Sequence, residues 1–247
     1  MVHRVIKMNI DLKLFSEKEV NDIYKKYVVK DESYYSKANE RFDRLPIQKK
    51  QRYHHMDFPR VASLFDFKDW IQKYNLTKVD SLLSTFEGDY ELEYIEVSNL
   101  KVCKYDNPEV YDSTNENDLH LIDLDKKDFD FIIFNQTLEH VYNPFIVMKN
   151  LYDHLKPGGY LYTTVPTINI PHEVPFHFWG ITPIGLCMLS RSVGFNICEC
   201  GYWGNYEYLG YLFTNNGWPG VDDVRDDNGK INSTDLCQAQ TWILVQK

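Results

Sequence analysis

The chain has 247 residues, with 27 Lys and Arg against 36 Asp and Glu, which gives a formal net charge of −9. Wrapping a nucleic acid through its phosphates requires a clustered basic surface, so this balance argues against a nucleic-acid-binding protein. Apolar residues make up 43% of the chain, which is enough to bury a core in one large domain or in one domain with an appendage.

Neither the apolar runs nor the cysteines indicate a secreted or membrane protein. No window approaches the roughly 20 uninterrupted apolar residues of a membrane helix, and charges interrupt the start of the chain before a signal-peptide core forms. The five cysteines form an odd set, and no Cys/His pairs have the spacing of a zinc site. We therefore expect a cytoplasmic protein with free thiols and without a metal site.

The first 77 residues are predicted to form a helical cap that is not an independent domain. Ser16 followed by Glu19 is a capping-box signature for a first helix. A second helix is predicted over residues 61–74, where apolar side chains recur with helical spacing.

From residue 78 onward, short apolar runs alternate with helical patterns. Strands are predicted over residues 79–84, 100–105, 119–124 and 129–135. Pro144 begins a helix that extends to Leu155, and another strand is predicted over residues 160–165.

The last part of the chain contains one more helix and two more strands. Thr182 and Pro183 begin a helix that ends near Gly194. Strands over residues 195–201 and 240–246 are expected to pair as a hairpin with a long insert. The predicted fold of residues 78–247 is thus α/β: a doubly wound, mostly parallel seven-stranded sheet with an antiparallel C-terminal edge hairpin.

Ligands of such sheets bind beyond the carboxyl ends of the strands, and the segments at those positions resemble a known family. The segments are residues 128–141, Leu155-Lys156-Pro157-Gly158-Gly159, residues 177–195 and residues 240–245. In combination they are similar to class I S-adenosylmethionine-dependent methyltransferases, in particular to bacterial capsule and sugar O-methyltransferases. The resemblance covers roughly residues 78–247 and implies a Rossmann-like methyltransferase fold and S-adenosylmethionine as cofactor.

The resemblance also implies positions for the cofactor. The family's glycine-rich loop corresponds here to Ser84, Phe86 and Gly88, of which only the last is a glycine, and Leu82 replaces the usual acid. Nearby acids that could receive the amino group of the cofactor are Asp80 and Glu87, between which the sequence does not decide.

Two further acids and one amide are candidate cofactor ligands. Asp106 lies where a carboxylate would accept the ribose hydroxyls, although a simple turn residue fits the position equally well. By resemblance, Asp123 would accept the adenine amino group, and Asn135 would lie near the cofactor.

Methyl transfer to an alcohol requires a base for the hydroxyl proton, and histidine suits this role. The candidate bases are His140, His172 and His177, with Asn135 and Glu139 orienting the acceptor. The last two histidines lie in a loop whose aromatic residues, Trp179 included, either stack on a sugar or pack the loop against the protein.

The most basic segment begins at Lys49. If the N-terminal helices form a lid over the pocket, Arg52 and Arg60 could hold the diphosphate of a nucleotide-linked sugar, and Tyr34 and Tyr35 could line the same lid. The alternative is an ordinary solvated face.

The leading hypothesis is an S-adenosylmethionine-dependent O-methyltransferase that modifies a hydroxyl of a nucleotide-activated sugar or a related capsule precursor. An acceptor that bears a phosphate or phosphoramidate group, or a nitrogen acceptor, stays open. The competing hypothesis is a non-catalytic methyltransferase-fold protein, because two loop glycines are replaced. An NAD-binding enzyme fits worse, since that fingerprint requires the glycines more strictly. The oligomeric state, a homodimer included, is left open by the sequence.

Overall fold

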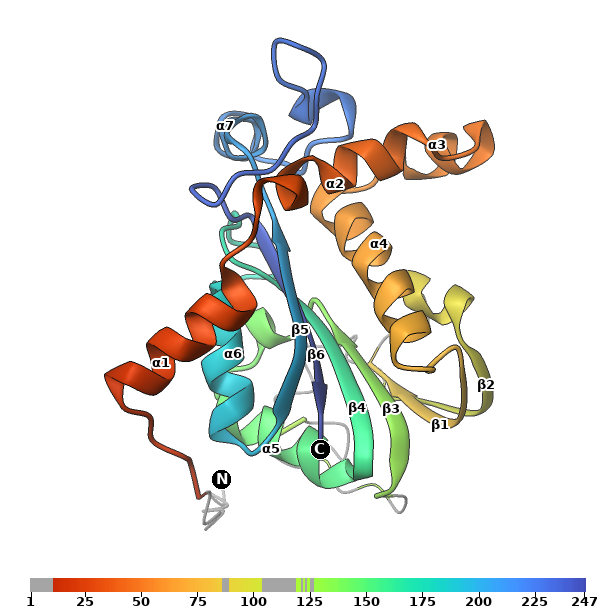
Figure 1. Ribbon diagram of the computed structural model, residues 1–247, viewed down its shortest axis with the longest axis vertical. Helices are drawn as coiled ribbons and strands as arrows, with labels where there is room; N and C mark the ends of the chain where they lie inside the picture. Colours follow the sequence, from red (N-terminus) through yellow and green to blue (C-terminus); the bar gives the residue numbers. More distant parts are fainter. Residues whose placement is uncertain (1–10, 86–88, 104–118, 121, 123, 125–126) are drawn as a thin grey trace.

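The computed structural model describes residues 11–85, 89–103, 119–120, 122, 124 and 127–247. Its centre is a six-stranded sheet with the strand order β2-β1-β3-β4-β6-β5 (Figure 1). The strands are β1 Lys78–Ser84, β2 Glu96–Val102, β3 Phe129–Asn135, β4 Leu155–Pro166, β5 Asn196–Trp203 and β6 Gln240–Gln246. Strands β2, β1, β3 and β4 are parallel, whereas β6 is antiparallel to both β4 and β5. The mostly parallel α/β fold with an antiparallel C-terminal edge is therefore confirmed.

The sheet has six strands in the described part of the chain instead of the seven predicted, and no strand is found among the described residues of the segment 119–124. Leu119 and His120 form a turn, and Ile122 and Leu124 have no regular structure. Leu119 and Ile122 are nonetheless buried in the core, and the carbonyls of Leu119 and His120 accept hydrogen bonds from the Asn150 side chain. The apolar pattern of this segment reflects burial against a helix rather than strand pairing.

Side chains of the central strands alternate between two apolar clusters, one on each face of the sheet. Ile132 and Phe134 belong to one cluster, and Phe131 and Ile133 belong to the other. All four are fully buried, as expected for a parallel strand that is covered by helices on both faces.

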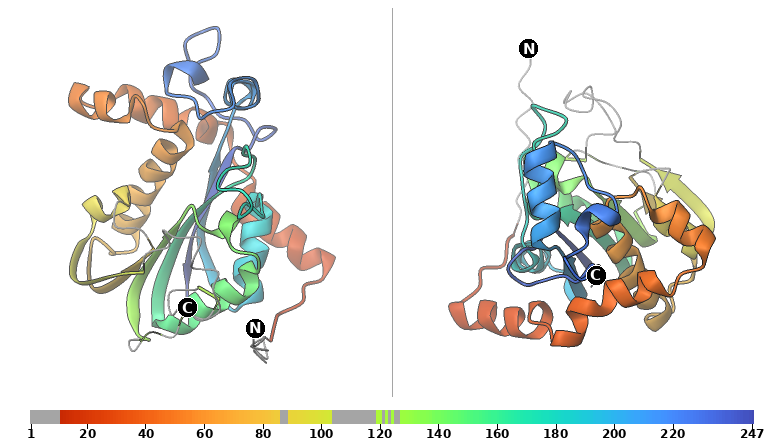
Figure 2. Two further views of the ribbon diagram at one scale, coloured as in Figure 1. Left: turned by 180° about the vertical axis from the view of Figure 1, so that it is seen from behind. Right: turned by 90° about the horizontal axis from the view of Figure 1, so that it is seen from above.

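Helices cover both faces of the sheet (Figures 1 and 2). One face carries α5 Pro144–His154 and α6 Pro183–Ser192, with α1 Glu17–Ile23 and the π-helical turn η1 Tyr24–Val28 packed beside α6. The other face carries α2 Glu32–Asp43, α3 Ile47–Tyr53, α4 Phe58–Lys73 and α7 Tyr206–Asn215. The residues before β1 thus contribute helices to both faces of the sheet.

Several local predictions are confirmed. Ser16 and Glu19 form the capping box of α1, and Thr182 caps α6. All five cysteines are free. Within the described part of the chain, no helix combines the length and apolar character needed to cross a membrane.

A buried carboxylate joins α2, α4 and β6. Asp66, which is 4% exposed, accepts a hydrogen bond from Trp242 Nε1 at 3.1 Å and pairs with Lys37 Nζ at 2.5 Å. Because Trp242 is buried and Lys37 is partly exposed, loss of the carboxylate costs most at the indole, whose N–H loses its acceptor.

We expect Asp66→Ala to lower the free energy of unfolding by about 2 kcal/mol, measured by chemical denaturation. Asp66→Asn, which retains an acceptor for Trp242, should cost about half as much. Asp69 on the same helix is half exposed and pairs with Arg41, so Asp69→Ala is the matched control and should cost less than about 0.5 kcal/mol. Equal losses for Asp66→Ala and Asp69→Ala would contradict the role given to the buried carboxylate.

Candidate active site

The carboxyl ends of β1 and β3 meet at one edge of the sheet, where polar side chains are buried. Ser84 ends β1, and its hydroxyl donates to Asp89 Oδ2 at 2.7 Å. The next residue, Thr85, is buried, and its hydroxyl has no hydrogen-bond partner among the described residues. Asn135 ends β3 and is 5% exposed. The structure thus places two of the predicted cofactor residues, Ser84 and Asn135, at the edge where the fold binds ligands.

Two acids that the sequence analysis did not single out lie beside this edge. Asp89 and Glu91 are each 4% exposed, and Glu91 belongs to the 3-10 helix η2 Tyr90–Tyr94. Burial raises the pKa of Asp89 to about 6, and burial together with the negative charge of Asp89 raises the pKa of Glu91 to about 8. The Arg60 guanidinium and the Asn135 amide act in the opposite direction on the pKa of both carboxyls. The edge therefore holds buried carboxyl groups that are protonated or poised to titrate near neutral pH.

The three candidate histidines come together at the same edge of the sheet. His140 lies in the 3-10 turn η4 Leu138–His140, and His172 and His177 lie in the loop between β4 and α6. The ring centroids of His172 and His177 are 4.6 Å apart, and those of His140 and His172 are 4.8 Å apart. We call these three residues the histidine cluster.

Burial changes the pKa values of the histidine cluster and of the neighbouring Glu139. Burial lowers the pKa of His140 and of His177, and the neighbouring imidazoles lower both pKa values further. Glu139 is 1% exposed, and burial raises the pKa of its carboxyl to about 8. Its Oε1 lies 3.8 Å from His140 Nε2, and neither carboxyl oxygen has a hydrogen-bond partner in the described part of the chain. A buried polar group without a partner is costly, so the position of Glu139 points to a ligand contact.

One backbone and one side-chain hydrogen bond hold the histidine-bearing loop against η4 and the residue that follows it. Phe178 N donates to Glu139 O at 2.7 Å, and Trp179 Nε1 donates to Val141 O at 2.8 Å. Trp179 also lines an open cavity of about 370 Å³ together with Tyr142 and Phe145. These three aromatic residues are 39–55% exposed, and the Tyr142 ring stacks on His120 with ring centroids 3.9 Å apart.

The predicted lid residues differ in where the structure places them. Arg60 reaches the acidic edge, where it influences Asp89, Glu91 and Glu139. Arg52 instead forms an exposed ion pair with Glu93.

The two tyrosines pack on β5. The Tyr34 hydroxyl donates to Tyr202 O at 2.9 Å and accepts from Tyr202 N at 2.8 Å, and the Tyr35 hydroxyl lies 3.3 Å from the Tyr202 hydroxyl. The structure does not bring them to the histidine cluster.

Three predicted cofactor residues, Gly88, Asp106 and Asp123, lie outside the described residues, as does Glu87. Asp80 is exposed within β1, before its carboxyl end. The available signal for Asp89 and Glu91 was their position soon after the first predicted strand, where the sequence analysis considered only Asp80 and Glu87 as acids for the cofactor.

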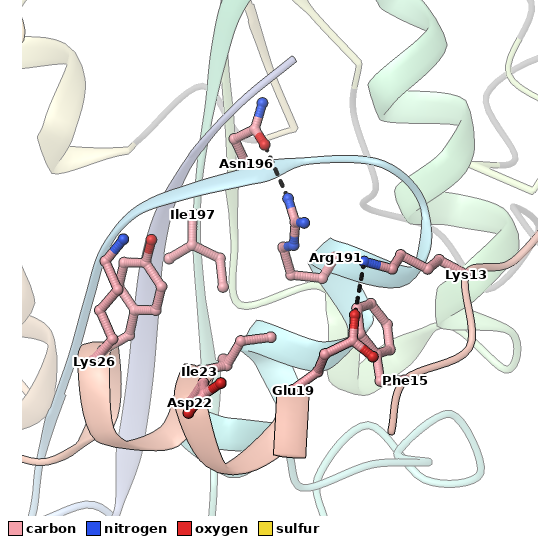
Figure 3. A pocket seen from close by; sticks show the side chains of 10 residues that line it. Lys13, Phe15, Glu19, Asp22, Ile23, Lys26, Arg191, Asn196 and Ile197 are labelled. Atoms are coloured by element: carbon pink, nitrogen blue, oxygen red, sulfur yellow. Dashed lines mark hydrogen bonds and ion pairs between the residues drawn. The ribbon is translucent and has the colours of Figure 1, made fainter. Parts of the chain in front are cut away.

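A second cavity, of about 390 Å³, lies between α1 and the start of β5 (Figure 3). Lys13 pairs with Glu19 at its rim, and Arg191 donates to Asn196. Because Asn196 is the first residue of β5, this cavity lies at the amino end of the strand. It is therefore distinct from the edge where sheets of this kind bind ligands.

Comparisons with known proteins support the enzyme class. Residues 84–192 match a protein family described as a methyltransferase domain. No curated protein is significantly similar to the chain in sequence. A candidate sarcosine dimethylglycine methyltransferase from Galdieria sulphuraria aligns with a TM-score of 0.50 and 12% identity, over 84% of this chain and 90% of that chain.

A 1,6-didemethyltoxoflavin-N1-methyltransferase from Burkholderia thailandensis, solved with its substrate and S-adenosylhomocysteine, aligns with a TM-score of 0.46 and 11% identity. That alignment covers 96% of this chain and 93% of that chain.

The fold and the family match define an enzyme of the methyltransferase class. Residues 84–192 contain a methyltransferase domain, so the chain is a methyltransferase, as predicted. S-adenosylmethionine is the cofactor that the sequence analysis predicts for this class. The described residues fit this cofactor, because the edge between β1 and β3 offers the buried Asp89 carboxylate, the unpartnered Thr85 hydroxyl and the Asn135 amide. These oxygens are suitable acceptors for the cofactor's amino and hydroxyl groups.

Proposed function

We propose that the chain is an O-methyltransferase that modifies a hydroxyl group of a nucleotide-activated sugar or of a related capsule polysaccharide precursor. The observation that carries the proposal is the histidine cluster beside the buried Glu139, at the edge where Ser84 and Asn135 end their strands. S-adenosylmethionine supplies a methyl group on a sulfonium centre when bound there. Ser84, Asp89 and Asn135 would hold the cofactor, and Glu139 and Asn135 would orient the acceptor.

The histidine cluster supports a hydroxyl acceptor. An alcohol must lose its proton as its oxygen attacks the methyl carbon in line with the bond to sulfur, and positioned side chains assist such transfers. His140 follows Glu139 directly, and its Nε2 lies 3.8 Å from Glu139 Oε1, so the group that orients the acceptor lies beside the groups that handle its proton.

The aromatic residues near the loop support a sugar acceptor. Phe178 and Trp179 are 41% and 42% exposed although they adjoin the histidine cluster in sequence. Aromatic rings that combine an apolar face with a polar edge suit ligands with both characters. Arg60 lowers the pKa of Asp89, Glu91 and Glu139, and Arg52 is paired with Glu93. The diphosphate role of both arginines therefore has less support than the role of the histidine cluster toward the acceptor.

The test is a panel of nucleotide sugars and matched amines, incubated with the purified chain and S-adenosylmethionine. Mass spectrometry reports the mass increase of one methyl group, and calorimetry with S-adenosylhomocysteine measures cofactor binding separately. Reactions with S-adenosylhomocysteine, which has no methyl group to give, are the control. We expect a methylated sugar hydroxyl. Methylation of amines alone would overturn the acceptor class, and a folded chain that binds neither cofactor form would favour the non-catalytic alternative.

A further inference from the structure

The histidine cluster has the composition of a metal site, although the sequence predicts none. One ligand-capable atom from each of His140, His172 and His177 lies within 4.8 Å of the others. Around a metal ion with bonds of about 2.0–2.1 Å, neighbouring ligand atoms are about 3.3 Å apart in a tetrahedral site. Small side-chain rotations would therefore bring the three imidazoles onto one ion.

The backbone hydrogen bonds of His140 and His172 match those of metal-bound histidines, whereas His177 Nδ1 lies 3.1 Å from His172 Nδ1. His140 Nδ1 lies 2.8 Å from Phe176 O, and His172 Nδ1 lies 3.0 Å from Ile170 O. A carbonyl oxygen only accepts, so in these contacts Nδ1 carries the proton and the neutral ring keeps its lone pair on Nε2. Histidine ligands of metals commonly donate their second ring nitrogen to a backbone carbonyl in this way.

Glu139 gives an independent indication of a missing cation. Its carboxyl group is 1% exposed, has no hydrogen-bond partner among the described residues and lies 3.8 Å from His140 Nε2. Glu173, on the histidine-bearing loop, adds a second carboxylate whose Oε2 lies 3.9 Å from His140 Nδ1. A divalent cation at the cluster would compensate the buried carboxylate at Glu139.

We propose that His140, His172 and His177 bind a divalent transition-metal ion, with Glu139 as fourth ligand or as outer-sphere carboxylate. Imidazole ligands favour Zn²⁺ and its neighbours in the transition series over Mg²⁺ and Ca²⁺, which prefer oxygen. The ion would link η4 to the loop between β4 and α6. If the proposed function holds, on which this last step rests, the ion would also hold an acceptor oxygen in place and lower the pKa of its hydroxyl. The ligating histidines would then act on the acceptor's proton through the ion rather than as free bases.

Metal binding is tested on the full-length chain, stripped with a chelator and free of any polyhistidine tag. Zn²⁺ is titrated calorimetrically, and the zinc content is measured after dialysis. Co²⁺ is used as a spectroscopic probe, since its visible absorption reports the coordination geometry. We expect about one Zn²⁺ per chain, and His172→Gln and His177→Gln should each weaken binding at least about tenfold.

The matched control is the double variant His54→Gln with His55→Gln. These two histidines also adjoin each other, with ring centroids 4.8 Å apart, but they lie outside the cluster. Substoichiometric zinc in the wild-type chain, or equal weakening by the control, would overturn the metal site. The readout does not depend on catalysis. Zinc binding without methyl transfer would therefore count against the proposed function alone, and methyl transfer by a zinc-free chain would count only against the role of the ion in holding the acceptor.

Discussion

Replacing His140 or His177 by alanine is expected to lower kcat by about 10²- to 10⁴-fold, the range over which positioned proton-transfer groups contribute. The affinity for S-adenosylhomocysteine should change little, because the cofactor contacts are assigned to Ser84, Asp89 and Asn135 rather than to the histidine cluster. Steady-state kinetics with saturating cofactor and calorimetry with S-adenosylhomocysteine measure the two quantities separately.

Two further variants keep this prediction informative. His140 is buried and its Nδ1 contacts Phe176 O, so His140→Gln is included as a variant that preserves more of the side-chain volume. His55→Ala removes an exposed histidine and should leave kcat unchanged. Near-wild-type kcat for both His140→Ala and His177→Ala would remove the cluster from catalysis. A loss of cofactor affinity equal to the loss of kcat would place the two histidines at the cofactor instead.

Continuous apolar runs predicted the central strands well. The bounds of β3 and β6 agree with the predicted 129–135 and 240–246, because both strands are buried on both faces and therefore have a continuous apolar run at their centre. Strand β2 is predicted too late, at 100–105 instead of Glu96–Val102. Most of its side chains are exposed, since it is an edge strand, and its polar residues give no apolar signal.

Helix α7 was missed for a different reason. Tyr206–Asn215 contains a glycine at its centre, and only Tyr208 and Leu212 are buried, so the helix has a narrow apolar stripe. Its N-cap Asn205, whose side chain accepts from Tyr208 N, was a usable start signal.

The residues of the candidate site were predictable only in part. The position of His140 after a strand indicated a place at the sheet edge, and the loop carrying His172 and His177 follows the next strand of the sheet. Their convergence on one point depends on hydrogen bonds such as Phe178 N to Glu139 O, which no local pattern encodes. Asp89 and Glu91 depend on η2 folding back over the end of β1, which is likewise a tertiary effect.

The buried carboxyl of Glu91 is expected to make the stability of the cofactor-free chain depend on pH. Its pKa is raised from the ordinary value of 4.5 to about 8 by burial and by Asp89. Between these two values the folded chain binds more protons than the unfolded chain, so the contribution of Glu91 to stability is greatest at low pH and is lost as the pH rises toward 8. The size of this loss is on the order of a few kcal/mol.

We therefore expect Glu91→Gln to be nearly neutral at pH 4.5, where glutamine resembles the protonated acid, and to raise the free energy of unfolding at pH 8 by a few kcal/mol. Chemical denaturation at several pH values between these limits measures the difference.

Glu93 is the matched control, because it lies on the same helix η2 but is exposed and has a pKa lowered by Arg52. The ionised Glu93 stabilises the folded chain only at pH values above the pKa that Glu93 has in the unfolded chain. Glu93→Gln should therefore leave the free energy of unfolding at pH 8 unchanged or slightly reduced. Parallel pH profiles for the wild type and Glu91→Gln would show that Glu91 ionises normally. In that case the acidic edge would be more hydrated than the burial of Glu91 implies.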